Sequence, residues 1–160
     1  MTNDKLILTP YLTPDLVQLN LTVGDWEAAI RAGGQLLLNA GKCTTAYVDA
    51  MVKAVHELGP YIALAPGLAL AHARPEDGVL ALGFSLVTLD PAIAFGSEAN
   101  DPIEVMICFC APDSESHISI LEALAVRLRD LELQQRLRQA ETIAEALSAF
   151  EGVADEKESP

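Results

Sequence analysis

The sequence is poor in basic and aromatic residues. Lys and Arg together number 10 against 23 Asp and Glu, which gives a formal net charge of −13. Nucleic-acid backbones are bound by clustered Lys and Arg, so this composition argues against nucleic acid as a partner. Aromatic residues make up only 5% of the chain and hydrophobic residues 51%, so the core must be mainly aliphatic. The acidic balance favours solubility and also suits a basic protein partner.

Cysteines are few, and long apolar runs are absent. The odd set Cys43, Cys108 and Cys110 has no framework spacing, which is not typical of a secreted protein. We expect Cys108 and Cys110 to be buried thiols, because their apolar run offers no other metal ligand. No segment reaches the roughly 18 apolar residues that a membrane-spanning helix needs, and the first residues do not form a signal peptide. We therefore expect a cytoplasmic protein.

The length of 160 residues predicts one α/β domain. We expect an N-terminal segment over residues 1–21, the domain over residues 22–150 and a disordered acidic tail over residues 151–160. Helices before and after a central group of apolar strands indicate an α/β sandwich. The predicted helices cover residues 22–41, 44–58 and 117–129 and two segments capped by Asp130 and Thr142, the last ending near Phe150; the predicted strands lie in residues 61–65, 68–71, 79–89, 93–95 and 103–111.

Three details of this prediction can be checked directly. Thr22, with Asp25 three residues later, is expected to cap the first helix. Leu58 is expected on the buried stripe of the second helix. The pair Asp90-Pro91 is expected to end the long apolar stretch that begins at Val79.

Histidine is the best candidate for reactive chemistry, because the sequence has neither a nucleophile-elbow motif nor a phosphate-binding P-loop. His72 follows a predicted strand and has small neighbours, so its imidazole should be approachable. A neutral imidazole has one free nitrogen lone pair, which can attack phosphorus and form a phosphoramidate. Arg74 could neutralise phosphate oxygens. The alternative is that His72 is a purely structural loop residue.

Two further histidines occur. His117 lies at the expected start of a helix, where free N–H groups and the helix dipole favour anions. It could donate a hydrogen bond to a phosphoryl group on His72, or it could be a helix-cap residue. His56, near the C-terminus of the second predicted helix, is expected to be structural.

Three segments carry a resemblance to a known family. Residues 59–78 have the sequence GPYIALAPGLALAHARPEDG, residues 95–102 have the sequence FGSEANDP, and His117 precedes an apolar helix. Over roughly residues 22–150, the chain resembles the enzyme IIA (EIIA type-2) domains of the mannitol/fructose class. These domains belong to the bacterial phosphoenolpyruvate-dependent sugar phosphotransferase system. Within the class, the resemblance is greatest to the ascorbate-specific branch.

The resemblance implies a mixed central sheet flanked by helices, which is the mannitol-type IIA fold. It also implies a phosphotransferase in which His72 is the phosphorylated nucleophile and His117 stabilises the phosphoryl group. The donor would be the phosphorylated carrier protein HPr. The acceptor would be a IIB component, which passes the group to a sugar entering through a IIC membrane protein. No metal or organic cofactor is implied, and the sequence leaves both the sugar and a homodimer open.

The sequence departs from the family pattern at two positions. Ala71 stands where the family usually has a proline before the active histidine, and this loss should loosen the loop, because proline fixes φ. Ala54, with Lys53 beside it, stands where the mannitol branch has an arginine on the preceding helix. Arg74 could take over that charge.

Two other functions remain open at the level of sequence. One is a regulatory IIA-like binding module, which would signal by docking to a partner rather than serve sugar transport. The other is a metal-dependent hydrolase that uses His72, His117 and a carboxylate, either Asp113 or Glu76.

Overall fold

One mixed sheet of five strands forms the centre of the protein. A computed structural model describes residues 7–158, with side chains described through residue 151. The strand order is β1-β4-β5-β3-β2, in which β4 and β5 are antiparallel, β1 runs parallel to β4, and β3 runs parallel to β5. This confirms the predicted mixed sheet. The strands are β1 (Val17–Leu21), β2 (Ala63–Ala65), β3 (Leu68–Ala71), β4 (Gly83–Ile93) and β5 (Ile103–Cys110).

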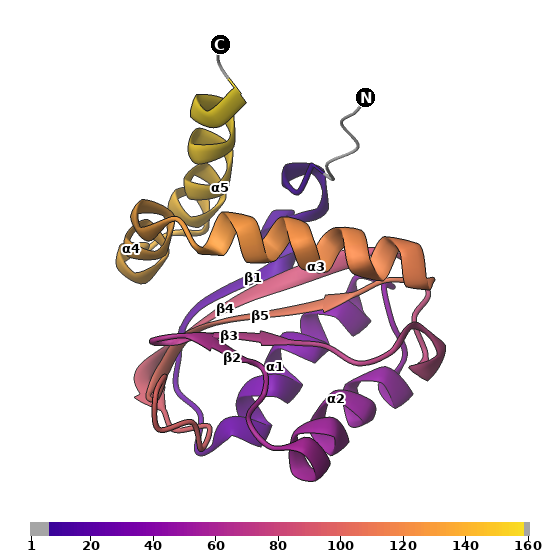
Figure 1. Ribbon diagram of the computed structural model, residues 1–160. Coiled ribbons are helices and arrows are strands. Elements are labelled where there is room, and N and C mark those ends of the chain that lie inside the picture. The colour runs from indigo at the N-terminus through magenta and orange to yellow at the C-terminus, as the bar shows by residue number, and fades with distance from the viewer. Residues whose placement is uncertain (1–6, 159–160) are drawn as a thin grey trace.

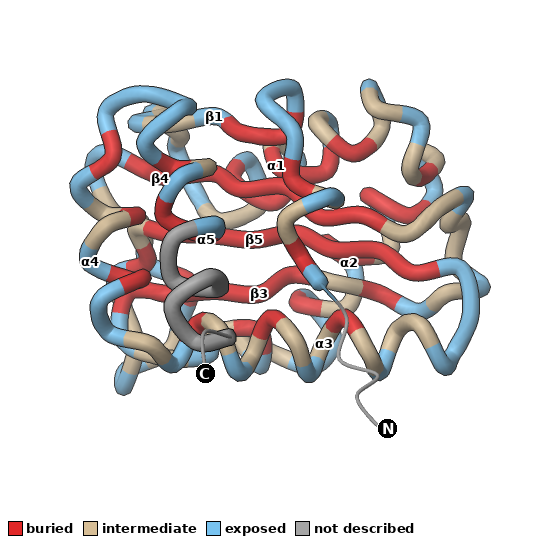
Figure 2. The backbone as a smooth tube through the Cα atoms, turned by 90° about the horizontal axis from the view of Figure 1, so that it is seen from above, coloured by how far each residue is buried: buried red, intermediate tan, exposed pale blue. Residues whose placement is uncertain are grey.

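Helices cover both faces of the sheet (Figure 1). Helices α1 (Trp26–Asn39) and α2 (Thr45–Leu58) lie below it, and α3 (Ser114–Leu128) and α5 (Ile143–Glu158) lie above it. Helix α4 (Leu131–Gln139) follows the last turn of α3. Figure 2 shows β3, β4 and β5 as mostly buried, since helices pack on each side of them. Among the helices of residues 7–158, none combines the length and apolar character needed to cross a membrane.

Helix α1 begins later than predicted. Its N-cap is Asp25, whose carboxylate accepts a hydrogen bond from the Ala28 N–H at 2.9 Å. The predicted cap at Thr22 is wrong, because the Thr22 hydroxyl donates instead to the Asp90 carbonyl. Helix α2 has Thr44 as its N-cap and Gly59 as its C-cap, which agrees with the predicted range 44–58. Leu58 is 70% exposed, so its predicted burial is wrong; it lies in the last turn, after the final buried residue of the helix.

Strand β4 continues past the pair Asp90-Pro91, where the sequence predicted its end. Proline has no N–H to donate to a sheet, and it is tolerated where regular pairing is interrupted. Such an interruption lies here, because the register between β4 and β5 shifts between Thr88 and Ile93. The short strand predicted for residues 93–95 therefore reduces to Ile93, the last residue of β4.

The described part of the N-terminal segment belongs to the domain. Two short 3-10 helices, η1 (Thr9–Tyr11) and η2 (Pro14–Leu16), lead into β1, which forms one edge of the sheet. The sequence does not predict this strand because it is short, although Gln18 and Asn20 alternate with its apolar residues as in a half-buried strand. At the other end of the chain, α5 continues to Glu158 instead of ending near Phe150. Residues 151–158, expected to be disordered, are thus helical, and residues 1–6 and 159–160 lie outside the described part.

All three cysteines are free and buried, which confirms the prediction for Cys108 and Cys110. Burial raises the pKa of both thiols to about 12 and that of Cys43 to about 11. At neutral pH these residues are therefore uncharged members of the core.

Candidate functional site

His72 lies at the point where β3 ends. It is the first residue after Ala71, whose pairing with Cys108 is the last register pair between β3 and β5. Its imidazole stacks on the ring of Phe109, with centroids 4.9 Å apart and an interplanar angle of 19°. The ring of Tyr61 approaches it edge-on at 5.6 Å. The imidazole is therefore half-buried among aromatic rings while its loop stays at the surface.

One hydrogen bond determines the tautomer of His72. Its Nδ1 lies 3.0 Å from the carbonyl oxygen of Leu70. A carbonyl oxygen only accepts, so Nδ1 must carry the hydrogen, which leaves the lone pair of the neutral ring on Nε2. Burial lowers the pKa of His72, the Leu70 bond acts against this, and the neighbouring His117 lowers it further. The ring is thus neutral at pH 7, with Nε2 available as a nucleophile.

The structure brings His117 next to His72. The two ring centroids are 5.6 Å apart with an interplanar angle of 63°, and the His117 ring is 5.2 Å from that of Phe109. His117 lies in the first turn of α3, whose N-cap is Asp113, so the cap-residue alternative for His117 is wrong. Its Nδ1 is buried and has no hydrogen-bond partner within the described residues. Burial lowers the pKa of His117, and the carboxylate of Glu76 acts in the opposite direction.

The loop after His72 is fixed to α2. The Thr44 hydroxyl donates to the carbonyl of Gly78 at 2.9 Å, and the Thr44 N–H donates to the same oxygen. Gly78 has φ of 123°, and a Cβ there would lie 2.2 Å from the Thr44 hydroxyl oxygen, so only glycine fits. These contacts hold the loop although Ala71 replaces the family proline.

Arg74 lies in the same loop and is exposed. Its backbone N–H donates to the Asp77 carboxylate at 3.0 Å, at the start of the 3-10 helix η3 (Pro75–Asp77). Across the described side chains, the Arg74 guanidinium belongs to no ion pair. Its charge therefore remains available at the rim of the site, although the structure does not place it against either imidazole.

The other residues raised by the sequence lie away from this pair. His56 is 3.5 Å from the Glu27 carboxylate, and its ring packs edge-on against Trp26, so it joins α1 and α2. Lys53, beside Ala54, is exposed and lies 4.0 Å from Glu57. The described residues contain no group of three or more His, Cys, Asp or Glu placed to hold a metal. The hydrolase alternative therefore lacks a ligand set in this part of the chain.

The aromatic wall of the site, formed by Phe109 and Tyr61, is not evident from the sequence. Phe109 lies inside a predicted strand and Tyr61 at the start of a short apolar run, and nothing in either segment marks these residues as part of a site. The register could have identified Phe109, because it lies directly across from His72 one step beyond the Ala71–Cys108 pair. The pairing itself, however, cannot be derived from one sequence.

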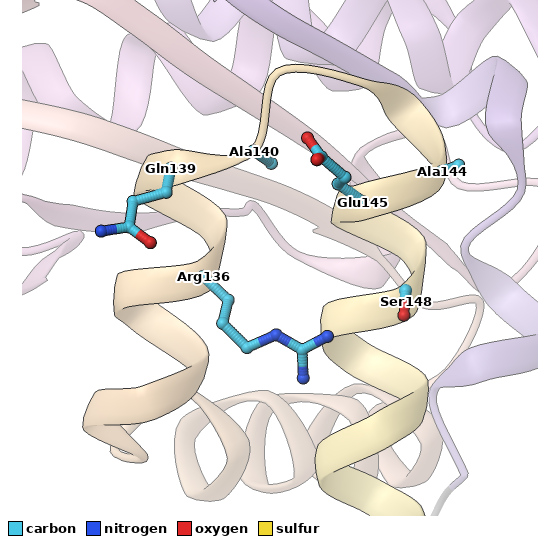
Figure 3. A pocket seen from close by; sticks show the side chains of 6 residues that line it. All are labelled: Arg136, Gln139, Ala140, Ala144, Glu145 and Ser148. Atoms are coloured by element: carbon cyan, nitrogen blue, oxygen red, sulfur yellow. The ribbon is translucent and has the colours of Figure 1, made fainter.

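A separate pocket lies between α4 and α5 (Figure 3). The carboxylate of Glu145 lines it, but this group already accepts the N–H groups of Glu141 and Thr142 at the start of α5. The pocket is lined by no imidazole and no cysteine, and its Ser148 has no histidine beside it in the lining, so the candidate site remains the two histidines. The full lining is Arg136, Gln139, Ala140, Ala144, Glu145 and Ser148.

Comparisons with known proteins match this chain to one protein family. Residues 10–152 match the family model described as "Phosphoenolpyruvate-dependent sugar phosphotransferase system, EIIA 2". The ascorbate-specific PTS system EIIA component of Salmonella choleraesuis is 36% identical over 136 residues, which cover 84% of this chain and 88% of that protein.

Solved structures give the same result. The mannitol-specific cryptic phosphotransferase enzyme IIA CmtB of Escherichia coli aligns with a TM-score of 0.83 and 31% identity, covering 91% of this chain and 98% of that one. A complex of enzyme IIAMTL with phosphorylated enzyme IIBMTL, also from E. coli, aligns with a TM-score of 0.76 and 27% identity. It covers 86% of this chain and 95% of the matched chain.

Proposed function

Because the chain belongs to the EIIA type-2 family of the phosphoenolpyruvate-dependent sugar phosphotransferase system, we propose that it carries the phosphoryl group on Nε2 of His72. The observation that carries this proposal is the bond between Nδ1 of His72 and the Leu70 carbonyl, which leaves Nε2 as the free nucleophilic atom. The lowered pKa of His72 supports it, because a protonated ring has no lone pair to attack phosphorus.

The proposed step is an in-line displacement at phosphorus. The Nε2 lone pair of His72 forms the new N–P bond while the N–P bond of the donor phosphohistidine breaks, and the donor nitrogen keeps the electron pair. The Nδ1 hydrogen of His72 stays in its bond to Leu70, so the phosphorylated ring carries positive charge. This charge makes the ring a good leaving group for the next transfer, which uses the same displacement in reverse.

His117 is proposed to stabilise the phosphoryl group. Its ring lies 5.6 Å from that of His72, close enough for an N–H to donate to a phosphoryl oxygen. Such a bond is charge-assisted and is stronger in a half-buried site than in water. Arg74, exposed at the rim, is proposed to neutralise charge on the phosphoryl group or on the approaching partner.

The proposed donor is phosphorylated HPr, and the proposed acceptor is a IIB component. The solved complex of a IIA protein with a phosphorylated IIB protein supports the second partner. The ascorbate-specific relative supports an ascorbate-type transporter, which the chain would serve through IIB and, indirectly, a IIC membrane protein. The net charge of −13 suits basic docking surfaces. The proposed location is the cytoplasm, where exchange with these proposed partners would take place.

The proposal is tested by incubating the chain with phosphoenolpyruvate, enzyme I and HPr, and mapping the phosphate by mass spectrometry. We expect one acid-labile phosphate on His72 and none in His72→Gln. His56→Gln is the matched control and should be labelled like the parent. Labelling of His72→Gln would overturn the assignment. Adding an ascorbate-type IIB protein separates the carrier from the regulatory alternative, because only a carrier passes the phosphate on.

A further inference from the structure

Tyr47 is a buried residue of α2 whose hydroxyl lies beneath the proposed phosphorylation site. The residue is 0% exposed. Its hydroxyl oxygen accepts a hydrogen bond from the Ala73 N–H at 2.9 Å and donates one to the Phe109 carbonyl at 2.7 Å. Ala73 directly follows His72, and Phe109 carries the ring on which His72 stacks. The single hydroxyl thus contacts the backbone on both sides of the stacked pair.

These two bonds replace a direct bond between the strands. Pairing of β3 with β5 ends at Ala71, and Leu70 donates its N–H on the β2 side of the strand. Because backbone groups alternate between the two edges of a strand, the N–H groups of Ala71 and Ala73 face β5. In this register, the next bond of the ladder would join the Ala73 N–H directly to the Phe109 carbonyl. The Tyr47 hydroxyl lies between these groups and joins them through its own two hydrogen bonds, so the two strands are separated here.

The separation lies where His72 and Phe109 face each other. Their rings stack at 4.9 Å, and Nδ1 of His72 is bound to the Leu70 carbonyl on the same strand. The direction of Nε2 therefore depends on the backbone that the Tyr47 hydroxyl holds apart. Since Tyr47 is fully buried, it contacts neither the phosphoryl group nor a docked protein.

We propose that Tyr47 is a positioning residue for phosphoryl transfer, which holds His72 and Phe109 at the spacing that directs Nε2 of His72 toward its partner. This inference rests on the proposed phosphorylation of His72. It predicts a change in kcat without a change in KM, because a buried positioning residue affects the transfer step and leaves partner docking unchanged.

The first test is Tyr47→Phe, which removes only the hydroxyl oxygen. With phospho-HPr as donor, we expect kcat to fall about tenfold to a hundredfold, the loss typical of a small misplacement of a reacting group, with KM unchanged. Tyr11→Phe is the matched control, because Tyr11 lies in η1, outside the site, and it should keep the kinetics of the parent. A raised KM with unchanged kcat would overturn the proposal, since it would indicate docking.

The second test needs no phosphate. In ¹⁵N spectra of the unphosphorylated protein, Tyr47→Phe should shift the ring nitrogens of His72 and leave those of His56 unchanged. If that variant does not fold, 3-fluorotyrosine at position 47 keeps the ring and weakens the hydroxyl as an acceptor, and it should produce a smaller shift in the same signals. Unchanged His72 signals in the folded variant would overturn the proposal.

The two proposals fail in different ways. If the parent takes no phosphate from phospho-HPr, the proposed function is wrong, while the ¹⁵N spectra still report whether Tyr47 positions His72. If the parent is phosphorylated and Tyr47→Phe matches it in kcat and in its His72 signals, only the role of Tyr47 is wrong.

Discussion

Replacing His117 by alanine should slow phosphorylation of His72 without preventing it. His117 is a neighbour of the proposed nucleophile, with ring centroids 5.6 Å apart, and it is not the nucleophile itself. A hydrogen bond to a charged group contributes about 1.5–3 kcal/mol. At 1.36 kcal/mol for each factor of ten, the loss of this bond should slow transfer roughly 10- to 150-fold. The fold should tolerate the change, because Nδ1 of His117 has no partner in the described structure that would be left unpaired.

The assay is rapid-quench transfer from phospho-HPr, which measures the rate and the final stoichiometry separately. His117→Ala should reach the same final level as the parent, since His72 is intact. His56→Ala serves as the control, because His56 lies against Trp26 and Glu27, outside the histidine pair. A rate within twofold of the parent would refute the proposed stabilisation. Complete loss of labelling in a folded variant would point to His117 as the nucleophile.

Two further predictions concern pH and packing. Burial lowers the pKa of His72 below its ordinary value of 6.5, so the neutral, reactive ring persists below that pH. The rate of phosphorylation, measured with pre-formed phospho-HPr, should therefore stay level through pH 6.5 and decline only below it. A decline centred above pH 6.5 would contradict the assignment. In Gly33→Ala, the new Cβ would lie 2.5 Å from Sγ of Cys108. The free energy of unfolding, measured with urea, should therefore fall by about 1–3 kcal/mol, although alanine has a better helix propensity than glycine. Cys108→Ala in the same chain should recover much of this loss, whereas a stabilised single variant would contradict the close contact.

The regular parts of the fold could be predicted from the sequence because they follow local rules. Apolar periodicity located both helices below the sheet, and the predicted range 44–58 matches α2. The edge strand β1 carries the period-two alternation of a half-buried strand, but with only three apolar residues this signal is too short to separate it from a loop. The continuation of β4 past Pro91 depends on a register shift against β5, which is a property of two paired strands.

The residues of the site also fall into those that the sequence can identify and those that it cannot. His72 and Arg74 could be named from one loop, because small neighbours and a nucleophilic ring are local features. The approach of His117 was implied only by the family resemblance, since it lies 45 positions after His72 in the sequence. Phe109 and Tyr47 could not be identified, because their roles depend on strand register and on a hydroxyl that reaches the backbone from a helix below the sheet.

The central claim is that the phosphoryl group is carried on Nε2 of His72. Its most direct test is ¹⁵N and ³¹P NMR of the chain with ¹⁵N-labelled histidine after phosphorylation by phosphoenolpyruvate, enzyme I and HPr. We expect phosphorus to couple to Nε2 of His72 while Nδ1 keeps its hydrogen, as the bond to Leu70 requires. Coupling to Nδ1 of His72, or to either nitrogen of His117, would contradict the account.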